Sequence, residues 1–338
     1  MIYPSRSHFV PPYILEQLAK QGNIHCKRTL LETQRIVQSR NTALNGLLQR
    51  QDQEGNGGRK VYDSQNKYLQ QVKLVRQEGD AKIGDRAVDD AYDLSGYVRD
   101  YFKNTFFLDS LDGRGMQLIS NVHYGTGYNN AFWDGDEITY GDGDGVQFLN
   151  FSSGIDVVGH ELVHGITQFL GNLEYKGQSG SLNEHFSDVF ATVIKQKYLN
   201  QDISKADWLI GDTVVAKDFP GKAIRSLKTP GTANEFDRQP DHMVRYYNGA
   251  SDNYGVHINS GIPNRAFYLS CQAIGIKDCA LIWFETLRGL WRTANFNDML
   301  TMILKMAAQL IDENKVSPKA DIALSESFSS VGIVPMAT

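Results

Sequence analysis

The chain has 338 residues, of which 41% are hydrophobic and 22% are charged, and its formal net charge is −5. This composition is typical of a globular protein, and the length is sufficient for a large core divided into more than one unit. No apolar run reaches about 18 residues, and the first thirty residues lack a basic start followed by an apolar core. The three cysteines do not form a disulfide framework. We therefore expect no membrane or nucleic-acid partner and no cleavable signal peptide, so the chain is cytoplasmic when made and any export uses another route.

Charge is unevenly distributed along the chain. Residues 1–50 contain seven Lys or Arg against two Asp or Glu, whereas the remainder contains 27 against 37. The basic segment could bind any polyanion, or complementary charge could hold it against the acidic remainder. The second interpretation fits the boundary better, because residues 14–38 have helix-like apolar repeats and the polar, glycine-rich stretch at about 49–60 predicts an exposed linker.

A short motif precedes these helical repeats. Two consecutive prolines predict an extended, low-entropy segment, and the three residues after them offer apolar anchors. The motif consists of Pro11, Pro12, Tyr13, Ile14 and Leu15.

The rest of the chain predicts an α+β fold in two lobes. From about 58 to 150, short alternating runs such as residues 115–124 and many Gly-Asp turns indicate strands, with one helix at 87–106. The run GDGDG at 141–145 predicts a glycine-rich hairpin turn, because it lacks the further acids of a calcium loop. After residue 154 the spacing becomes mostly helical. The later helices are predicted at 262–273, 279–293 and 297–310.

The most informative run is HELVH at 160–164. On a helix, His160 and His164 lie one above the other, and zinc accepts two such imidazole nitrogens. Glu161 then faces a water molecule on the metal, which is the arrangement of zinc proteases. The flanking residues are apolar on nearly every side, so the helix is predicted to be buried and its polar groups need partners.

A second helix at about 181–190 supplies a third ligand. Ser181 with Glu184 three residues later predicts a capping box. Glu184 and Asp188 share one helical face, so one can bind zinc while the other accepts the N–H of a ligand imidazole. His185 points about 100° away and is not counted as a ligand.

These motifs resemble the thermolysin-like zinc metallopeptidases, the M4 family. HELVH and NEHFSD are joined by YNNAFWDG at 128–135, AIRS at 223–226 and DNYGVHINSGIPNRAFY at 252–268, all in the family's order. The short N-terminal part of the chain, which carries the motif Pro11–Leu15, resembles the propeptides in precursors of the protealysin branch. The resemblance implies a propeptide at 1–50 and a β-rich catalytic lobe at 58–172 that includes the metal helix. A helical catalytic lobe at 173–338 follows, with one zinc ion in the cleft between the lobes.

The resemblance also implies roles for individual residues. His160, His164 and Glu184 would bind zinc, Glu161 would act as general base, and Asp188 would support His160. The transition state would be stabilised by His257 and Tyr175, with Asp252 orienting His257. The peptide main chain would be bound by Asn130, Ala131, Trp133 and Arg225. The first primed pocket would be lined by Phe148, Phe151, Val157, Ile210, Val214 and Ile224.

Because that pocket is apolar, we expect cleavage on the amino side of bulky hydrophobic residues. We expect the family's double calcium site to be absent. Asp156, Asp207 and Asp212 match calcium positions, but Lys195 and Leu209 stand where two more carboxylates are needed.

The sequence thus predicts a monomeric zinc endopeptidase, made as a zymogen whose motif at Pro11–Leu15 occupies the primed side of its own cleft. Cys26 as a zinc-binding switch is disfavoured because His25, Lys27 and Arg28 surround it. The alternative is a zinc protein that binds peptides without cutting them, which loss of Glu161, Tyr175 or His257 would have favoured. The protein substrate, the activating cut and the export route do not follow from the sequence.

Overall fold

The computed structural model describes residues 7–41 and 57–335, and within them a five-stranded sheet and a largely helical second half confirm the predicted α+β class. The sheet has the order β2-β1-β3-β5-β4, with β1, β3 and β5 parallel and the outer strands antiparallel to their neighbours. Its strands are β1 (Arg59–Asp63), β2 (Lys73–Gln77), β3 (Leu118–Val122), β4 (Ala131–Trp133) and β5 (Ile138–Tyr140).

One long helix, α4 (Arg86–Phe106), packs beside the sheet, close to the predicted 87–106. It begins where the side chain of Asp85 accepts the backbone N–H groups of Ala87 and Val88, an N-cap. It ends at Phe107, which has a left-handed backbone. Sequence reasoning therefore located this helix to within one residue at each end.

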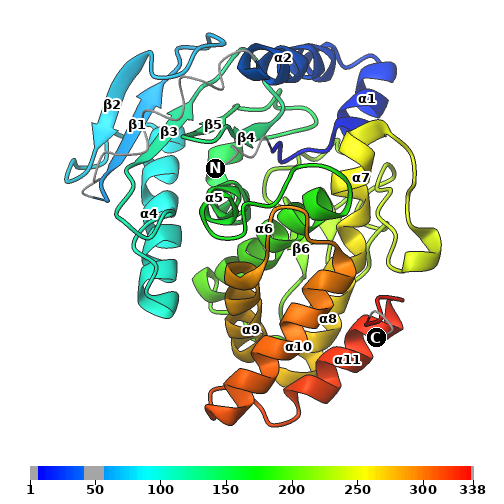
Figure 1. Cartoon of the computed structure of the whole chain (residues 1–338). Coiled ribbons are helices and arrows are strands. Elements are labelled where there is room, and N and C mark those ends of the chain that lie inside the picture. Colours follow the sequence, from blue (N-terminus) through cyan, green and yellow to red (C-terminus); the bar gives the residue numbers. More distant parts are fainter. Residues whose placement is uncertain (1–6, 42–56, 336–338) are drawn as a thin grey trace.

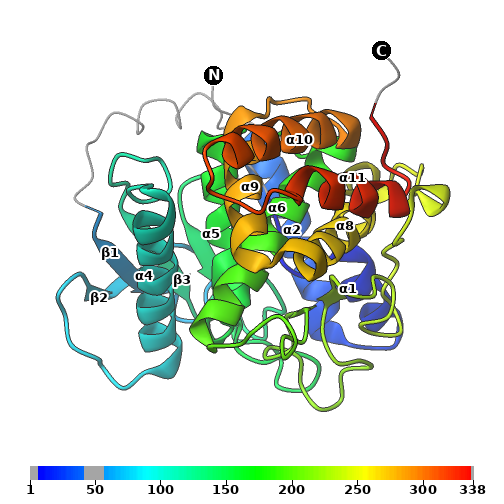
Figure 2. The same cartoon turned by 90° about the horizontal axis from the view of Figure 1, so that it is seen from below.

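Two buried helices, α5 (Ile155–Phe169) and α6 (Gly177–Tyr198), lie at the centre of the molecule. In both views they separate the sheet and α4 from the C-terminal helices (Figures 1 and 2). The predicted capping box at Ser181 is wrong, because α6 begins four residues earlier. Ser181 lies inside the helix and donates to the carbonyls of Gly177 and Gly255.

The C-terminal half is mostly helical, as predicted. The helix predicted at 279–293 begins and ends earlier, since Leu290 is extended, and the helix after residue 319 was missed. The remaining elements are β6 (Leu209–Ile210), β7 (Arg225–Ser226), α7 (Ser251–Asn259), α8 (Gly261–Ile274), α9 (Ile276–Gly289), α10 (Phe296–Asp312) and α11 (Ala320–Ser330), with short 3-10 turns at Phe151–Ser153 and Met243–Arg245.

The predicted hairpin turn at 141–145 is also wrong. The segment is a loop that leads from β5 to the turn before α5 and does not join two paired strands of the described sheet. Asp144 organises it, because its carboxylate accepts the backbone N–H groups of Val146, Gln147 and Phe148. It also accepts the side-chain amide of Asn23, so this loop contacts the N-terminal helices.

At the N-terminus, α1 (Pro12–Lys20) and α2 (Ile24–Asn41) lie across the top of Figure 1, near β4 and α7. Gly22 has a φ of 98° and breaks the helical repeat between them. Pro11 is extended, as predicted, but Pro12 is not, because it is the first residue of α1, where its missing N–H costs nothing. The predicted linker at about 49–60 lies largely outside the described residues.

Candidate functional site

Helix α5 carries His160, Glu161 and His164, and all three side chains are fully buried. One turn of helix separates the histidines, which brings their Nε2 atoms to 3.0 Å from each other. Nδ1 of His160 is 2.9 Å from an oxygen of Asp188, and Nδ1 of His164 lies 2.7 Å from Oδ1 of Asn183. Each Nδ1 thus faces an acceptor, and the two Nε2 atoms converge, so with a metal bound each ring would present the lone pair of Nε2 to it.

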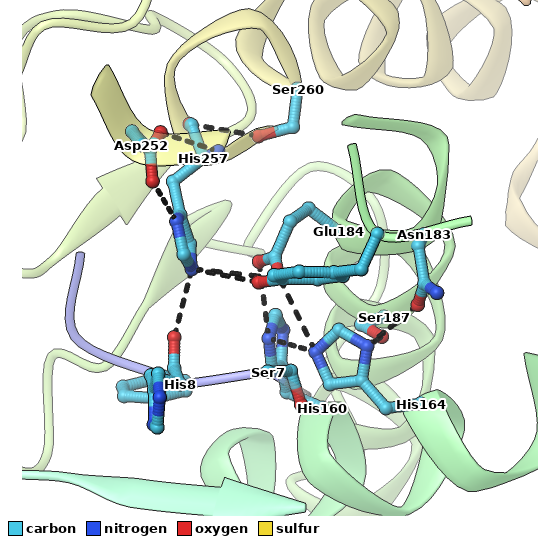
Figure 3. A network of polar contacts seen from close by, with 12 residues as sticks. Ser7, His8, His160, His164, Asn183, Glu184, Ser187, Asp252, His257 and Ser260 are labelled. Atoms are coloured by element: carbon cyan, nitrogen blue, oxygen red, sulfur yellow. Dashed lines mark hydrogen bonds and ion pairs between the residues drawn. The ribbon is translucent and has the colours of Figure 1, made fainter. Parts of the chain in front are cut away.

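The third donor comes from α6. The carboxylate of Glu184 places Oε2 at 3.4 Å from Nε2 of His160 and Oε1 at 3.5 Å from Nε2 of His164 (Figure 3). Oε2 of Glu184 is buried and accepts no hydrogen bond from the described residues. These separations fit a zinc ion, because ligands at 2.0–2.1 Å in a tetrahedron lie about 3.3 Å apart. The three predicted ligands therefore form a set suited to a catalytic zinc ion.

Acidic neighbours create a negative environment around this set. Burial opposes the charged form of His160, but Asp188 and Glu184 outweigh it and raise the pKa of its imidazole to about 9. Burial lowers the pKa of His164 to about 3, so this ring is neutral and able to bind a metal. His160 is therefore charged in the metal-free protein, and a divalent cation bound at its Nε2 would displace that proton and balance the nearby carboxylates.

Two partners of His164 were missed by sequence reasoning. Besides Asn183, the hydroxyl of Ser187 lies 3.1 Å from its Nδ1. Both residues lie on α6 beside Glu184, at positions one before it and three after it. Short polar side chains in a buried helix need hydrogen-bond partners. Their presence beside a predicted metal ligand therefore indicates that they orient another ligand of the same metal.

Glu161 lies next to the donor set. Its Oε2 accepts the backbone N–H of Trp133 at 2.7 Å and the hydroxyl of Ser7 at 3.2 Å. Its Oε1 is buried and accepts no hydrogen bond from the described residues. Burial raises the pKa of this carboxyl to about 7, which is suited to a group that accepts and returns a proton near neutral pH.

His257 approaches from α7, supported by Asp252. Nδ1 of His257 is 2.6 Å from one oxygen of Asp252, whose other oxygen accepts the backbone N–H of His257 at 2.9 Å. Nε2 of His257 lies 3.1 Å from the hydroxyl of Tyr175, which also donates to Glu184. Burial opposes the charged ring, but Glu184 and Asp252 raise the pKa of His257 to about 9. Both of its ring nitrogens therefore act as donors.

The backbone around Asp252 is unusual. Residues Asp252, Asn253 and Tyr254 have φ angles of 56°, 48° and 65°, and Gly255 follows at 80°. Left-handed backbone costs energy outside glycine and persists only where other contacts fix it. Here it turns the carboxylate of Asp252 back onto His257, whose orientation depends on this contact.

Residues Ser7–Val10, the N-terminal segment, lie along three of the predicted peptide-binding residues, Asn130, Ala131 and Arg225, whereas the backbone N–H of Trp133 donates to Glu161. Asn130 accepts the N–H of Val10 at 2.8 Å through Oδ1 and donates to its carbonyl at 3.1 Å through Nδ2. The N–H of Phe9 donates to the carbonyl of Ala131 at 3.0 Å. These contacts come from the residues before the Pro11–Leu15 motif, whereas Tyr13, Ile14 and Leu15 are buried in the hydrophobic core.

Two cationic side chains hold the carbonyls of the same segment. Nη1 of Arg225 donates to the carbonyl of Phe9 at 2.8 Å. Nε2 of His257 donates to the carbonyl of His8 at 2.9 Å (Figure 3). Arg225 also binds Asp188 through Nε at 3.0 Å and Nη2 at 2.9 Å.

The six residues predicted to line the first primed pocket are fully buried. The ring of Phe9 packs edge-on against Phe151 and His160, with centroids 6.3 and 5.4 Å away. A Cβ on Gly211 would approach both Phe9 and Ile224 within 3 Å, so only glycine allows these two side chains to meet there. Phe9 therefore occupies this apolar region.

A lysine lies among the three predicted calcium acids. Nζ of Lys195 contacts Asp212, lies 3.2 Å from Asp207 and 3.7 Å from Asp156, and donates to the carbonyl of Leu209 at 3.1 Å. Burial opposes its charge, but Asp156 and Asp212 outweigh it and raise the pKa of the ammonium group. The cation among these carboxylates is thus supplied by the chain itself.

Comparison with known proteins agrees with this geometry. Residues 27–168 match the family model for the thermolysin metallopeptidase catalytic domain, and 171–333 match that for its alpha-helical domain. An extracellular metalloprotease of Pectobacterium carotovorum subsp. carotovorum is 40% identical over 96% of this chain and 95% of its own. Thermolysin of Alicyclobacillus acidocaldarius subsp. acidocaldarius is 35% identical over 94% of this chain and 59% of its own.

Among solved structures, the precursor of protealysin, a metalloproteinase from Serratia proteamaculans, matches with a TM-score of 0.85 and 38% identity. The match covers 97% of this chain and all of that one. In the described part of the chain, no helix is both long and apolar enough to cross a membrane. The chain belongs to the M4 family of thermolysin-like metallopeptidases and is a metalloendopeptidase.

Proposed function

We propose that the chain is a zinc-dependent neutral endopeptidase, made as a zymogen that its own N-terminal residues inhibit. One observation carries this proposal. The N-terminal segment is hydrogen-bonded along the groups that a peptide substrate needs, from Glu161 and His257 to Asn130 and Arg225. While it is bound, no other peptide can use them.

Each site residue then has a chemical role. A zinc ion held by His160, His164 and Glu184 would polarise the scissile carbonyl and acidify a water molecule. Glu161 takes a proton from the attacking water and delivers it to the leaving amine. His257 and Tyr175 donate hydrogen bonds to the carbonyl oxygen as its negative charge develops, which stabilises the transition state more than the ground state.

The remaining residues orient these groups. Asp188 fixes the ring of His160, and Asp252 fixes that of His257, so each imidazole presents Nε2 to the site. Asn130 and the carbonyl of Ala131 bind the peptide as a strand added beside β4. We assign residues 1–50 to the propeptide, 58–172 to the first catalytic lobe and 173–338 to the second.

Preference for a bulky hydrophobic residue after the scissile bond is supported by Phe9. This side chain is fully buried beside Phe151 and Ile224, where a charged side chain would lose its hydration without a partner. The motif Pro11–Leu15 anchors the segment by burying its apolar side chains in the core. Cys26 takes no part, because it is buried beside Asn129, which donates to its sulfur at 3.3 Å.

A quenched fluorescent peptide with Phe or Leu after the scissile bond tests this function. Full-length chain is assayed before and after limited proteolysis between residues 41 and 57, with and without a zinc chelator. Activity that appears on processing and disappears with chelator supports the zymogen. A processed, zinc-loaded protein that binds the peptide without cutting it supports instead the non-catalytic peptide-binding alternative.

A further inference from the structure

Two carbonyl groups of the N-terminal segment accept hydrogen bonds from different side chains. His257 holds the carbonyl of His8, and Arg225 holds that of Phe9. In the proposed function, His257 is the donor to the oxygen of the bond that is attacked. The carbonyl in the reactive position is therefore that of His8, and the bond that follows it is His8–Phe9.

The residues after this bond are bound as the primed side of a substrate would be. The N–H of Phe9 donates to Ala131 on the edge strand β4, and Val10 makes two hydrogen bonds with Asn130. Main-chain pairing of this kind fixes both the direction and the register of an extended peptide. The segment thus runs from Ser7 at the catalytic groups to Val10 at the outer primed position.

The side chain of Phe9 fits the same register. It is the residue directly after the bond, it is aromatic, and it occupies the buried apolar region beside Phe151. The guanidinium carbon of Arg225 lies 5.1 Å from the centre of its ring. A shift of one residue would place His8 or Val10 there and would break the contacts with Asn130 and Ala131.

The general base remains available beside this bond. Ser7 and Trp133 donate to Oε2 of Glu161, whereas Oε1 is buried and accepts no hydrogen bond from the described residues. Oε1 is thus the oxygen that can accept a proton from an attacking water. The segment occupies the site without blocking both oxygens of the base.

From these contacts we infer that the chain is a substrate of its own site, and that the metal-loaded precursor hydrolyses its His8–Phe9 bond in cis. This inference rests on the proposed peptidase function. The oxygen of water bonds to the carbonyl carbon of His8, the C–N bond to Phe9 breaks, and one water proton passes through Glu161 to the nitrogen of Phe9. The products are a carboxyl group on His8 and an amino group on Phe9.

This cut does not by itself release inhibition. Arg225 and Asn130 still hold Phe9 and Val10 afterwards, and Val10 remains joined through Pro11 to the buried helix α1. We therefore expect loss of residues 1–8 before any activity on external peptides, and a separate cut nearer the catalytic domain for full activation.

Intact mass spectrometry of zinc-loaded full-length chain tests the inference. The expected result is loss of residues 1–8 at a rate independent of protein concentration. Phe9→Asp should slow the cut by at least about 100-fold, because it places a charge in an apolar region. Phe9→Leu should stay within about tenfold of the wild type. Ile24→Asp, on an exposed position of α2, serves as the matched control and should leave the rate unchanged.

The fluorescent peptide assay on the processed protein separates the two proposals. If the external peptide is cut while the His8–Phe9 bond stays intact, or if Phe9→Asp is cut at the wild-type rate, the register is wrong and the peptidase function stands. A concentration-dependent cut overturns hydrolysis in cis. If neither the external peptide nor the His8–Phe9 bond is cut, both proposals fail.

A second readout does not depend on turnover. In zinc-free Glu161→Gln full-length chain, the amides of Phe9 and Val10 should exchange slowly with solvent deuterium, because both donate hydrogen bonds. The added change Phe9→Asp should remove this protection, and Ile24→Asp should not. Fast exchange of both amides in the Glu161→Gln chain would overturn the proposed register.

Discussion

The guanidinium group of Arg225 joins the carboxylate of Asp188 to the main chain of Phe9. Asp188 in turn faces His160, so Arg225, which binds the carbonyl of Phe9, also contacts the partner of a predicted zinc ligand. Both charged side chains are fully buried, and the amide of Asn264 donates to Asp188 at 2.9 Å. Peptide binding and ligand orientation therefore share one buried ion pair.

Removal of Arg225 should weaken both the binding of a peptide and the ion pair that orients His160 through Asp188. In Arg225→Met, Asp188 keeps a buried charge with too few partners, and we expect the free energy of unfolding to fall by about 3–5 kcal/mol. Arg225→Lys keeps the charge but cannot bridge both partners in the same way, so kcat/KM of the processed enzyme should fall at least tenfold. Denaturant unfolding and peptide kinetics measure these effects. Arg245→Met, at an exposed arginine, is the control and should change neither quantity.

Substitutions of Glu161 and Glu184 should have different effects on zinc binding and on kcat. Glu161→Gln keeps the shape of the side chain but removes the base, so the processed enzyme should retain zinc and lose about 10²–10⁴-fold in kcat. Glu184→Gln removes a metal ligand, and zinc should then be lost on dialysis. Elemental analysis together with peptide kinetics distinguishes the two variants. Loss of zinc from Glu161→Gln would contradict the assigned division of roles.

Sequence reasoning found the metal donors because they are local. The spacing of His160 and His164 is fixed by the helical period, and Glu184 stands on the next helix. The cap at Ser181 was misplaced because Gly177 already begins α6, and tertiary contact with Gly255 satisfies the serine instead. Local patterns do not record such distant partners.

The occupancy of the site by Ser7–Val10 was harder to predict. Phe9 and Arg225 are separated by 216 positions, and His8 and His257 by 249. No local period links residues so far apart, and the short Ser-His-Phe-Val run carries no motif that marks it as a ligand of the site. The prolines that follow it restrict the backbone, but Pro11 is the N-cap of α1 and Pro12 is its first residue.

Lys195 should take the place of calcium in stabilising the contact between α6 and the segment 207–212. In Lys195→Met the acids at 156, 207 and 212 lose their shared cation, so the free energy of unfolding should fall by about 3–5 kcal/mol. Wild-type thermal stability should not change when calcium is added after a chelator that spares zinc. Lys205→Met, which removes an exposed lysine, should be neutral. Calcium-dependent melting of the wild-type protein would refute the substitution of lysine for the metal.

His123 should make the stability of the sheet lobe depend on alkaline pH. Its ring lies between Asp142, 2.9 Å from Nδ1, and Asp85, the N-cap of α4, 3.1 Å from Nε2. The hydrogen bond with Asp142 raises the pKa of this imidazole to about 9, despite burial. Because the folded pKa lies above the unfolded value of about 6.5, the stabilisation is complete below pH 6.5 and is lost as the pH rises through 9.

Thermal unfolding between pH 6 and 10 measures this contribution. His123→Asn removes the titrating ring while tolerating the left-handed backbone at this position, where φ is 54°. We expect the variant to be less stable than the wild type at pH 6 and the difference to shrink above pH 9, where the wild-type ring is neutral. Zinc-free protein should behave in the same way, because His123 does not contact the metal donors. A difference that stays constant across this range would show that the ring stabilises the fold by packing and not by its charge.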